Sequence, residues 1–297
     1  MARSCPSLQP DVAGAILRPM TAPNTKLTVR RLLVDLQTPF DRHWNGGDAF
    51  RSALFNALSM SFPAGEQVFI DAVRVGLQAL PPEQQARWAD EAQAFIGQEA
   101  THRRIHTLFN EQLARQGLVN HWQGRIQARA AALEQVGPRN RLAVTAATEH
   151  WTAIFAEHLL AHPQLLDGAD PRLRDLWLWH SAEESEHRST AFDLYRALGG
   201  NEAWRLRIFR IVSGHFVVDT ARQTLHNLWR DGSWWRLGTW VSAWKVLLGP
   251  QGLLRRGIGP WRRYLRADFH PSQADGSAAT GWLREHADLA PPVRAGG

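Results

Sequence analysis

The chain has 297 residues and a formal net charge of +6, and it is long enough to bury a core without disulfides or structural metal. Its 44% hydrophobic and 21% charged residues exclude a disordered protein, and its uncharged apolar runs are too short to span a membrane. The single cysteine, Cys5, excludes a disulfide framework and a zinc ribbon, and no secretion signal is recognisable, so we expect a cytoplasmic protein.

The chain is predicted to be all-α, because apolar residues recur at spacings of three and four from about 48 to 248. Residues 1–25 are predicted to form a flexible N-terminal tail, and the one plausible strand covers 26–36. Helix-starting prolines and helix-ending glycines divide the rest. The predicted helices span roughly 48–80 (broken or kinked near Pro63), 82–116, 120–136, 138–162 and 171–198, and two more follow Asn201.

These helices predict two main parts. Residues 26–200 form a four-helix bundle whose two hairpins are joined by a long crossover connection. Residues 201–271 form a helical extension, rich in tryptophan and arginine, that packs on the bundle. Residues 272–297, rich in small residues and proline, are predicted to be a flexible tail.

A glutamate and a histidine stand in the middle of the inward face of the second long helix. Residues that follow one another at alternating spacings of four and three share one side of a helix. That face consists of Trp88, Ala92, Phe95, Glu99, His102, His106, Phe109 and Leu113. The pair Glu99 and His102 forms Glu-x-x-His, and a core helix rarely buries both side chains without a partner.

The fourth long helix repeats this face 85 residues later. Its members are Leu173, Trp177, His180, Glu184, His187, Ala191 and Leu194. Glu184 and His187 therefore correspond to Glu99 and His102. Glu183 also lies near the inner side, and we choose Glu184 because it continues the spacing of the face.

Each motif is preceded by another glutamate in the middle of a helix. Glu66 lies 33 residues before Glu99, and Glu149 lies 35 residues before Glu184. Counted from the turn of each hairpin, the two members of a pair lie at nearly the same height. Two glutamates plus two Glu-x-x-His motifs, one residue set from each helix, are the ligand set of ferritin-like di-iron carboxylate bundles.

Metal is the simplest partner for this set. Four carboxylates in a core are strongly destabilising when unpaired, whereas two divalent cations balance their charge. Oxygen-rich ligands with one imidazole per metal favour iron, or alternatively manganese, over zinc. We therefore predict two metal ions, bound by Glu66, Glu99, His102, Glu149, Glu184 and His187. His106, His180 and Glu183 are either hydrogen-bond partners of the ligands or additional ligands. The competing interpretation is that these residues are solvated glutamates and ordinary core histidines.

Several motifs resemble the bacterial family of predicted metal-dependent hydrolases, over about 25–271. They are Phe62-Pro63-Ala64-Gly65-Glu66, Gln98-Glu99-Ala100-Thr101-His102, Thr148-Glu149-His150-Trp151-Thr152, His180-Ser181-Ala182-Glu183-Glu184-Ser185-Glu186-His187 and Phe269-His270-Pro271. The resemblance implies a metal-binding helical protein, and the name of the family implies hydrolysis.

Residues 227–267 form an unusually basic segment, with eight basic residues against one acidic residue, Asp231. The same segment contains six tryptophans: Trp229, Trp234, Trp235, Trp240, Trp244 and Trp261. Tryptophan beside arginine favours peripheral contact with an anionic membrane, at the inner face of the cell membrane, or with a lipid-like substrate. The equal alternative is that the tryptophans cover the bundle. The many Leu, Val and Ile residues disfavour nucleic acid.

Three functions fit these features. The carboxylate-rich site favours an oxygen-dependent di-iron enzyme that oxidises a small apolar or amphiphilic substrate. The same ligands permit a dimetal hydrolase of an ester, amide or phosphate. A non-catalytic metal-binding protein is the third. The sequence leaves open the substrate, the native metal and the oligomeric state.

Overall fold

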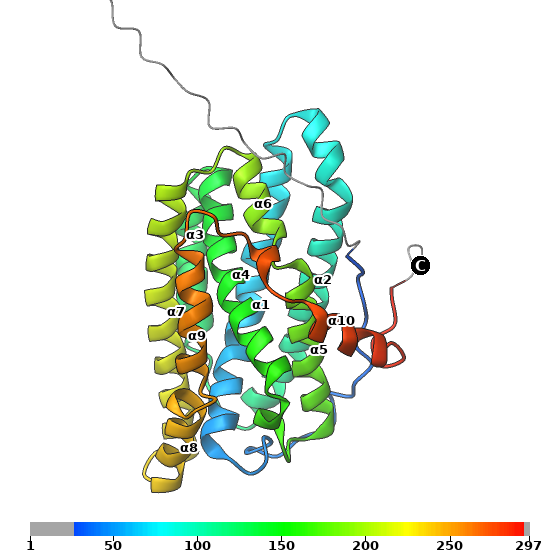
Figure 1. Cartoon of the computed structure of the whole chain (residues 1–297). Coiled ribbons are helices and arrows are strands. Elements are labelled where there is room, and N and C mark those ends of the chain that lie inside the picture. The colour runs from blue at the N-terminus through cyan, green and yellow to red at the C-terminus, as the bar shows by residue number, and fades with distance from the viewer. Residues whose placement is uncertain (1–26, 294–297) are drawn as a thin grey trace, which may run out of the picture.

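The computed structural model describes residues 27–293, and every regular element in that range is helical (Figure 1). This confirms the all-α prediction. The long helices are α1 (Ala49–Gln78), α2 (Pro82–Arg115), α4 (Pro138–Ala161) and α7 (Glu202–Asp231). The shorter elements are α3 (Trp122–Glu134), η1 (Pro163–Leu166), α5 (Pro171–His187), α6 (Thr190–Ala197), α8 (Leu237–Leu248), α9 (Leu253–Tyr264), η2 (Pro271–Gln273) and α10 (Ser277–Glu285).

Three of the bundle helices begin at a proline. Pro82, Pro138 and Pro171 occupy the first turns of α2, α4 and α5, where the missing N–H has no partner to lose. The carboxylate of Asp170 caps α5 by accepting a hydrogen bond from the backbone N–H of Arg172. The predicted starts of these helices are therefore confirmed.

Helix α1 is continuous through Pro63, so the predicted break is wrong. A proline inside a helix removes the hydrogen bond to the carbonyl four residues earlier, here that of Ser59. The side-chain amide of Asn110 on α2 donates to this Ser59 carbonyl at 2.9 Å. The lost backbone bond is thus replaced from the neighbouring helix, and α1 needs no interruption.

The helices α1, α2, α4 and α5 run alongside one another (Figure 1). The end of α1 meets the start of α4, because a side chain at Gly76 would contact Leu142. The α3 connection returns the chain along α1, so that α2 and α4 run in the same direction. The α1–α2 and α4–α5 pairs are thus two antiparallel hairpins joined through α3.

Helix α7 covers the outer side of α1 and α4, and α8 and α9 fold back beside it (Figure 1). The region after Asn201 contains more than the two helices that we predicted, because glycines at 232, 249 and 252 divide it. None of the helices within 27–293 has both the length and the apolar character needed to cross a membrane.

The chain differs from prediction in two further helical regions. The fourth bundle helix ends at His187 and resumes as α6 at Thr190, with Arg188 turned toward Glu157 and the carbonyl of Ala274. The predicted tail 272–297 contains α10, which packs on α5 through Ala279 and Leu283. Small residues suit this packing, although their composition resembles a linker. The predicted tail 1–25 lies outside the described residues.

The segment 27–36 is extended but forms no strand in the described chain, contrary to the prediction. It pairs with 289–293 at one isolated bridge, between Arg30 and Pro292. The backbone N–H groups of Arg31 and Val293 donate across this pair, to the carbonyls of Pro291 and Val29. Because Pro291 and Pro292 have no N–H to donate, a longer ladder cannot form.

Candidate metal centre

The charged residues of the bundle lie between two apolar clusters. Below them, Phe55, Phe109 and Trp177 belong to one cluster, and above them Phe95 and Leu194 belong to the other. The glutamates and histidines singled out from the sequence fall between these clusters on α1, α2, α4 and α5 alike. The four helices therefore bring charge to one level in the core, where apolar side chains would otherwise be expected.

All six predicted ligands are buried at this level. Their exposed fractions are at most 3%: Glu66, Glu99, His102, Glu149, Glu184 and His187. The predicted alternatives His106, His180 and Glu183 are equally buried and lie nearby.

The cluster consists of two similar halves. Donor atoms of Glu66, Glu99 and His102 lie within 4.8 Å of one another, and so do those of Glu99, Glu149 and His187. Glu99 belongs to both halves. Glu184 also spans them, because Oε1 lies 3.4 Å from Nδ1 of His102 and Oε2 lies 3.6 Å from Nε2 of His187.

Nine buried oxygen and nitrogen atoms of these side chains have no hydrogen-bond partner among the described residues. They are both carboxylate oxygens of Glu66, Glu99 and Glu149, Oε2 of Glu184, Nδ1 of His102 and Nε2 of His187. Buried polar atoms are almost always paired, and an unpaired buried carboxylate is strongly destabilising. The imidazole nitrogens lie close to the carboxylates, with Nε2 of His187 at 3.1 Å from Oε1 of Glu99. Carboxylate oxygens grouped with imidazole nitrogens in this way are suited to divalent cations. The residues therefore fit a metal centre.

The pKa values of buried groups in the cluster also indicate that it contains too few positive charges to balance its carboxylates. Burial, reinforced by the charge of Glu99, raises the pKa of the Glu66 carboxyl well above its usual range. Burial and the charges of Glu184 and Glu99 do the same to the pKa of Glu149. Burial opposes protonation of His102, but its contacts with Glu183 and Glu184 raise its pKa to about 10. Without metal the cluster holds protons instead, and bound cations would displace them.

Glu183 and Glu184 have different positions. Glu184 faces the centre of the cluster, whereas Glu183 lies outside it, with Oε2 at 3.0 Å from Nε2 of His102. Arg30 donates to the other oxygen of Glu183 at 3.2 Å. Glu183 thus orients the His102 ring so that Nδ1 points inward. The choice of Glu184 over Glu183 as a metal ligand stays a prediction.

His106 and His180 form a hydrogen-bonded pair beside the cluster. Nε2 of His106 and Nδ1 of His180 are 2.6 Å apart, and Nε2 of His180 lies 2.9 Å from Oε1 of Glu184. Nδ1 of His106 lies 2.8 Å from the Ser59 hydroxyl. Their donor atoms also approach Glu66, so both remain geometrically able to bind metal. The ring nitrogens of His106 and His180 are nevertheless all paired, whereas Nδ1 of His102 and Nε2 of His187 have no hydrogen-bond partner among the described residues.

Two residues near the cluster were missed from the sequence. The side-chain oxygen of Gln98 lies 3.0 Å from Nδ1 of His187, and so orients that ring as Glu183 orients His102. Arg30 reaches Glu183 and Glu186 from the extended N-terminal segment. Gln98 could have been suspected from its place beside Glu99, but no helical spacing relates Arg30 to α5.

A large apolar cavity of about 460 Å³ adjoins the cluster at Glu66.

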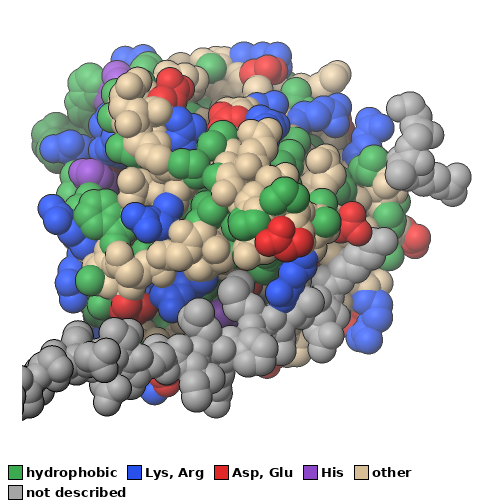
Figure 2. Space-filling view, turned by 90° about the horizontal axis from the view of Figure 1, so that it is seen from above, with side chains coloured by type: hydrophobic (Ala, Val, Ile, Leu, Met, Phe, Trp, Pro, Cys, Tyr) green, Lys and Arg blue, Asp and Glu red, His purple; other side chains and the backbone are tan. Residues whose placement is uncertain are grey.

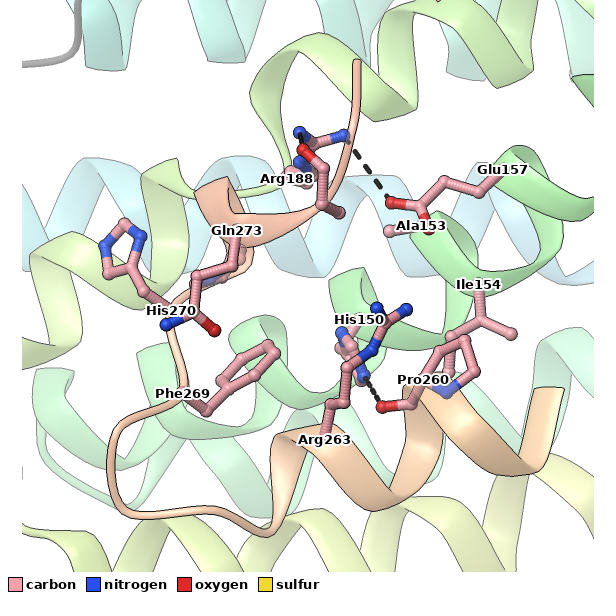
Figure 3. Close-up of a pocket in the computed structure, with 12 residues that line it drawn as sticks. His150, Ala153, Ile154, Glu157, Arg188, Pro260, Arg263, Phe269, His270 and Gln273 are labelled. Atoms are coloured by element: carbon pink, nitrogen blue, oxygen red, sulfur yellow. Dashed lines mark hydrogen bonds and ion pairs between the residues drawn. The ribbon is translucent and has the colours of Figure 1, made fainter. Parts of the chain in front are cut away.

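A second pocket, of about 30 Å³, lies between α4 and the segment after α9 (Figure 3). His150 and Phe269 line this small pocket, and His270 bonds Asp193 of α6 at 2.7 Å. Such a volume holds about one or two water molecules. The late Phe-His-Pro motif therefore fastens the C-terminal segment to the bundle and contributes nothing to the metal cluster.

The sequence model of one family, described as predicted metal-dependent hydrolase, matches residues 28–275. The chain belongs to this family. The match spans the bundle, the metal cluster and the helical extension. No curated protein and no solved structure matches the chain. Membership of the family supports an enzyme that depends on metal, in agreement with buried Glu and His groups able to bind it.

Proposed function

We propose that this metal-dependent enzyme binds two divalent ions in a ferritin-like four-helix bundle, and that it hydrolyses an apolar or amphiphilic substrate. The observation that carries the proposal is the set of unpaired buried donor atoms arranged in two halves. Glu66 and His102 would hold one ion, Glu149 and His187 the other. Glu99 and Glu184, which touch both halves, would lie between them.

Hydrolysis takes precedence because it is the reaction in the description of the family. Bound divalent ions supply a Lewis acid and lower the pKa of water. The chain's own residues hold the ligands in place through Glu183 and Gln98. The hydrogen-bonded pair His106 and His180 offers a path for a proton between Glu184 and Ser59. Phe62 packs against both imidazoles, with ring centroids 4.7 Å apart, and shields them from water.

Oxidation with oxygen is the second candidate, and the donor set favours it. Four carboxylates with one imidazole in each half are more typical of iron or manganese than of zinc. The cavity beside Glu66 is also lined mainly by apolar side chains, as an unreactive hydrocarbon would require. We therefore expect iron in the native protein under this alternative, with manganese next.

Metal substitution separates the two reactions. The full chain is stripped with a chelator and reloaded with Zn²⁺, or with Fe²⁺ under anaerobic conditions, and is given p-nitrophenyl octanoate, a chromogenic amphiphilic ester. Hydrolysis by the zinc form that is lost in Glu99→Gln supports the proposal. Oxygen uptake and a transient oxidised chromophore in the iron form alone would replace hydrolysis by oxidation. Glu111→Gln, an exposed glutamate on the same helix, is the matched control. Failure to retain either metal overturns both.

We further propose that the protein contacts anionic membranes through the end of α7 and through α8 and α9. Trp229, Trp235 and Trp244 are 59%, 78% and 58% exposed, and Leu237 is 78% exposed. Figure 2, which looks at the molecule from above, shows hydrophobic and basic side chains next to one another at the left edge, the side of α7 in Figure 1, whereas the end of α7 and α8 lie away from this view. Exposed apolar patches of this kind mark interaction surfaces.

Charge favours a lipid surface as the partner. The basic residues Arg236, Lys245, Arg255 and Arg256 are exposed on this side. The one acidic residue of the segment, Asp231, is largely buried and pairs with His43 at 2.6 Å and with Arg42 at 3.4 Å. It therefore does little to offset the positive potential. Tryptophan at the level of the lipid headgroups and basic residues on anionic lipid are the usual elements of peripheral binding.

A further inference from the structure

The cavity beside Glu66 is walled by four helices. It lies between α1, α3, α4 and α7, and its volume of about 460 Å³ falls in the usual range for small-molecule sites. Most of its lining is aliphatic or aromatic, including Val68, Ile126, Val144 and Ile208. A site with these walls excludes water and recognises hydrocarbon.

The cavity has a buried end and an exposed end. Glu66, at the buried end, is 1% exposed. Val136 and Ile211 line the same cavity and are 37% and 46% exposed, so the other end reaches the surface. A molecule that enters between α3 and α7 would thus meet the metal cluster at Glu66.

The cavity also approaches the second side of the cluster. Phe62, Thr152 and Phe216 line both this cavity and a small space next to His180 and Glu184. Phe62 also lies against the His180 ring. The cavity therefore adjoins the candidate metal centre at Glu66 and, across these three shared side chains, lies beside the space next to His180 and Glu184.

The lining carries a positive charge at Arg129, on α3. Asp219, which is 1% exposed, lies 2.5 Å from Nη1 of Arg129 and 2.7 Å from Nε of Arg125. Two guanidinium groups thus share one carboxylate, which leaves a net positive charge. Of the two arginines, only Arg129 lines the cavity. An anionic group inside the cavity would therefore pair with Arg129.

We propose that the cavity binds the hydrocarbon chain of an anionic amphiphile of the fatty-acid type, with its acidic group at Arg129 and its chain directed toward Glu66. This inference goes beyond the proposed hydrolysis, because a hydrocarbon chain directed toward Glu66 presents no bond for hydrolysis to the metal centre; it assigns a binding site for the amphiphile. Binding itself requires only the cavity. It can therefore be tested without metal and without turnover.

The test is titration of the full chain with cis-parinaric acid, a fluorescent fatty acid, before and after treatment with chelator. We expect saturable binding of about one probe per chain in both preparations. Gly65 lines the cavity, and a Cβ added there has no atom within 4 Å, so Gly65→Leu would extend a side chain into the cavity from an open position. This variant should weaken binding at least tenfold. Gly124→Leu, on α3 outside the cavity lining, also meets open space and should bind like the wild type.

The acidic group is tested separately by competition. Dodecanoate should displace the probe at least tenfold better than dodecanol, and Arg129→Gln should remove this preference. Circular dichroism and metal content establish that each variant is folded. Equal binding by wild type and Gly65→Leu, or the absence of saturable binding, overturns the proposal. Because these readouts need no metal, a metal centre that fails to load leaves them unaffected, and the two failures can be told apart.

Discussion

The centre of the bundle and the outer surface of α7, α8 and α9 deviate from ordinary protein structure in opposite directions. In the centre, charged side chains such as Glu66 and Glu149 are buried where apolar residues are expected. On the surface, Trp235 and Leu237 are each 78% exposed where polar residues are expected. Each arrangement is unfavourable in the isolated chain. Under the two proposals, each would become favourable with a different partner: divalent cations inside, and an anionic membrane outside.

The comparison shows that the environment of a residue is more informative than its type. The protein contains many other glutamates and tryptophans in ordinary positions. Glu111 is exposed on α2, and Trp179 is fully buried with its ring against His102. Function is indicated only where the polarity of a side chain does not match its burial and where several such side chains lie together.

Removal of Glu99 should have the largest effect in the centre. Because Glu99 contributes to both halves of the cluster, we expect Glu99→Ala to lose both metal ions, where the wild type approaches two per chain. Elemental analysis after purification from iron-supplemented cells measures this. Retention of two metals by Glu99→Ala would refute the shared position of this carboxylate.

Glu183→Ala is the neighbouring control for the centre. Glu183 touches His102 but does not face the cluster, so its loss should keep the stoichiometry and weaken affinity by about 10–100-fold. Glu184→Ala should lose at least one metal. The reverse result, with metal lost only in Glu183→Ala, would mean that α5 presents the other residue.

Truncation of an aromatic side chain should lower the free energy of unfolding strongly in the core of the bundle and only slightly on the outer surface. Phe109 is fully buried, stacked on Phe40 with ring centroids 5.1 Å apart, and Phe109→Ala should lower the free energy of unfolding by about 3–5 kcal/mol. Trp235→Ala should change it by less than about 0.5 kcal/mol. Urea unfolding of both variants is the measurement. A large loss in Trp235→Ala would show that this tryptophan packs on the bundle instead of serving a partner.

Membrane binding tests the outer surface directly. We expect sedimentation with phosphatidylglycerol vesicles at low salt, and little with phosphatidylcholine vesicles or at high salt. Replacing Trp235 and Trp244 by alanine, or Arg255 and Arg256 by glutamine, should reduce binding about tenfold. Arg174→Gln with Arg284→Gln removes the same charge from α5 and α10 and should have little effect. Negligible sedimentation under all conditions would favour a purely structural surface, and concentration-dependent dimers would assign it to a second copy.

The smallest predicted effect is on the pH dependence of stability, and it comes from His158, on α4 beneath this surface. Burial, with the nearby His162 and Arg256, lowers its pKa from 6.5 to about 4. The unfolded chain therefore binds this proton first, so stability is present above pH 6.5 and falls as the pH drops toward 4. We expect His158→Gln to reduce the loss of stability between pH 7 and pH 5 by about 1–2 kcal/mol. Equal pH dependence in wild type and variant would contradict this assignment.

Much of the bundle could be predicted because local rules determine it. Prolines such as Pro138 start helices through their fixed backbone angle, and the three-residue spacing of Glu99 and His102 places both on one side. The candidate ligands follow from the same periodicity on each helix. The continuity of α1 through Pro63 could not be predicted, because Asn110 satisfies the freed carbonyl from another helix.

Contacts between distant segments account for the other differences. The contact of Arg30 with Glu183 joins residues 153 positions apart, and no spacing rule relates them. Helix α10 was missed because its small residues look like a linker until α5 provides a surface for them. The cavity beside Glu66 depends on the placement of α3 and α7, which hydrophobic periodicity alone does not determine.

The pairing of 27–33 with 289–293 brings the two ends of the described chain together. The N–H of Val293 donates to the carbonyl of Val29 at 2.8 Å, so the two ends of this range meet. A circular permutant could therefore join them covalently and open the chain in the exposed segment 234–238. Arg30 would then lie in the middle of the polypeptide, and its hold on Glu183 would no longer rely on a few hydrogen bonds between chain ends.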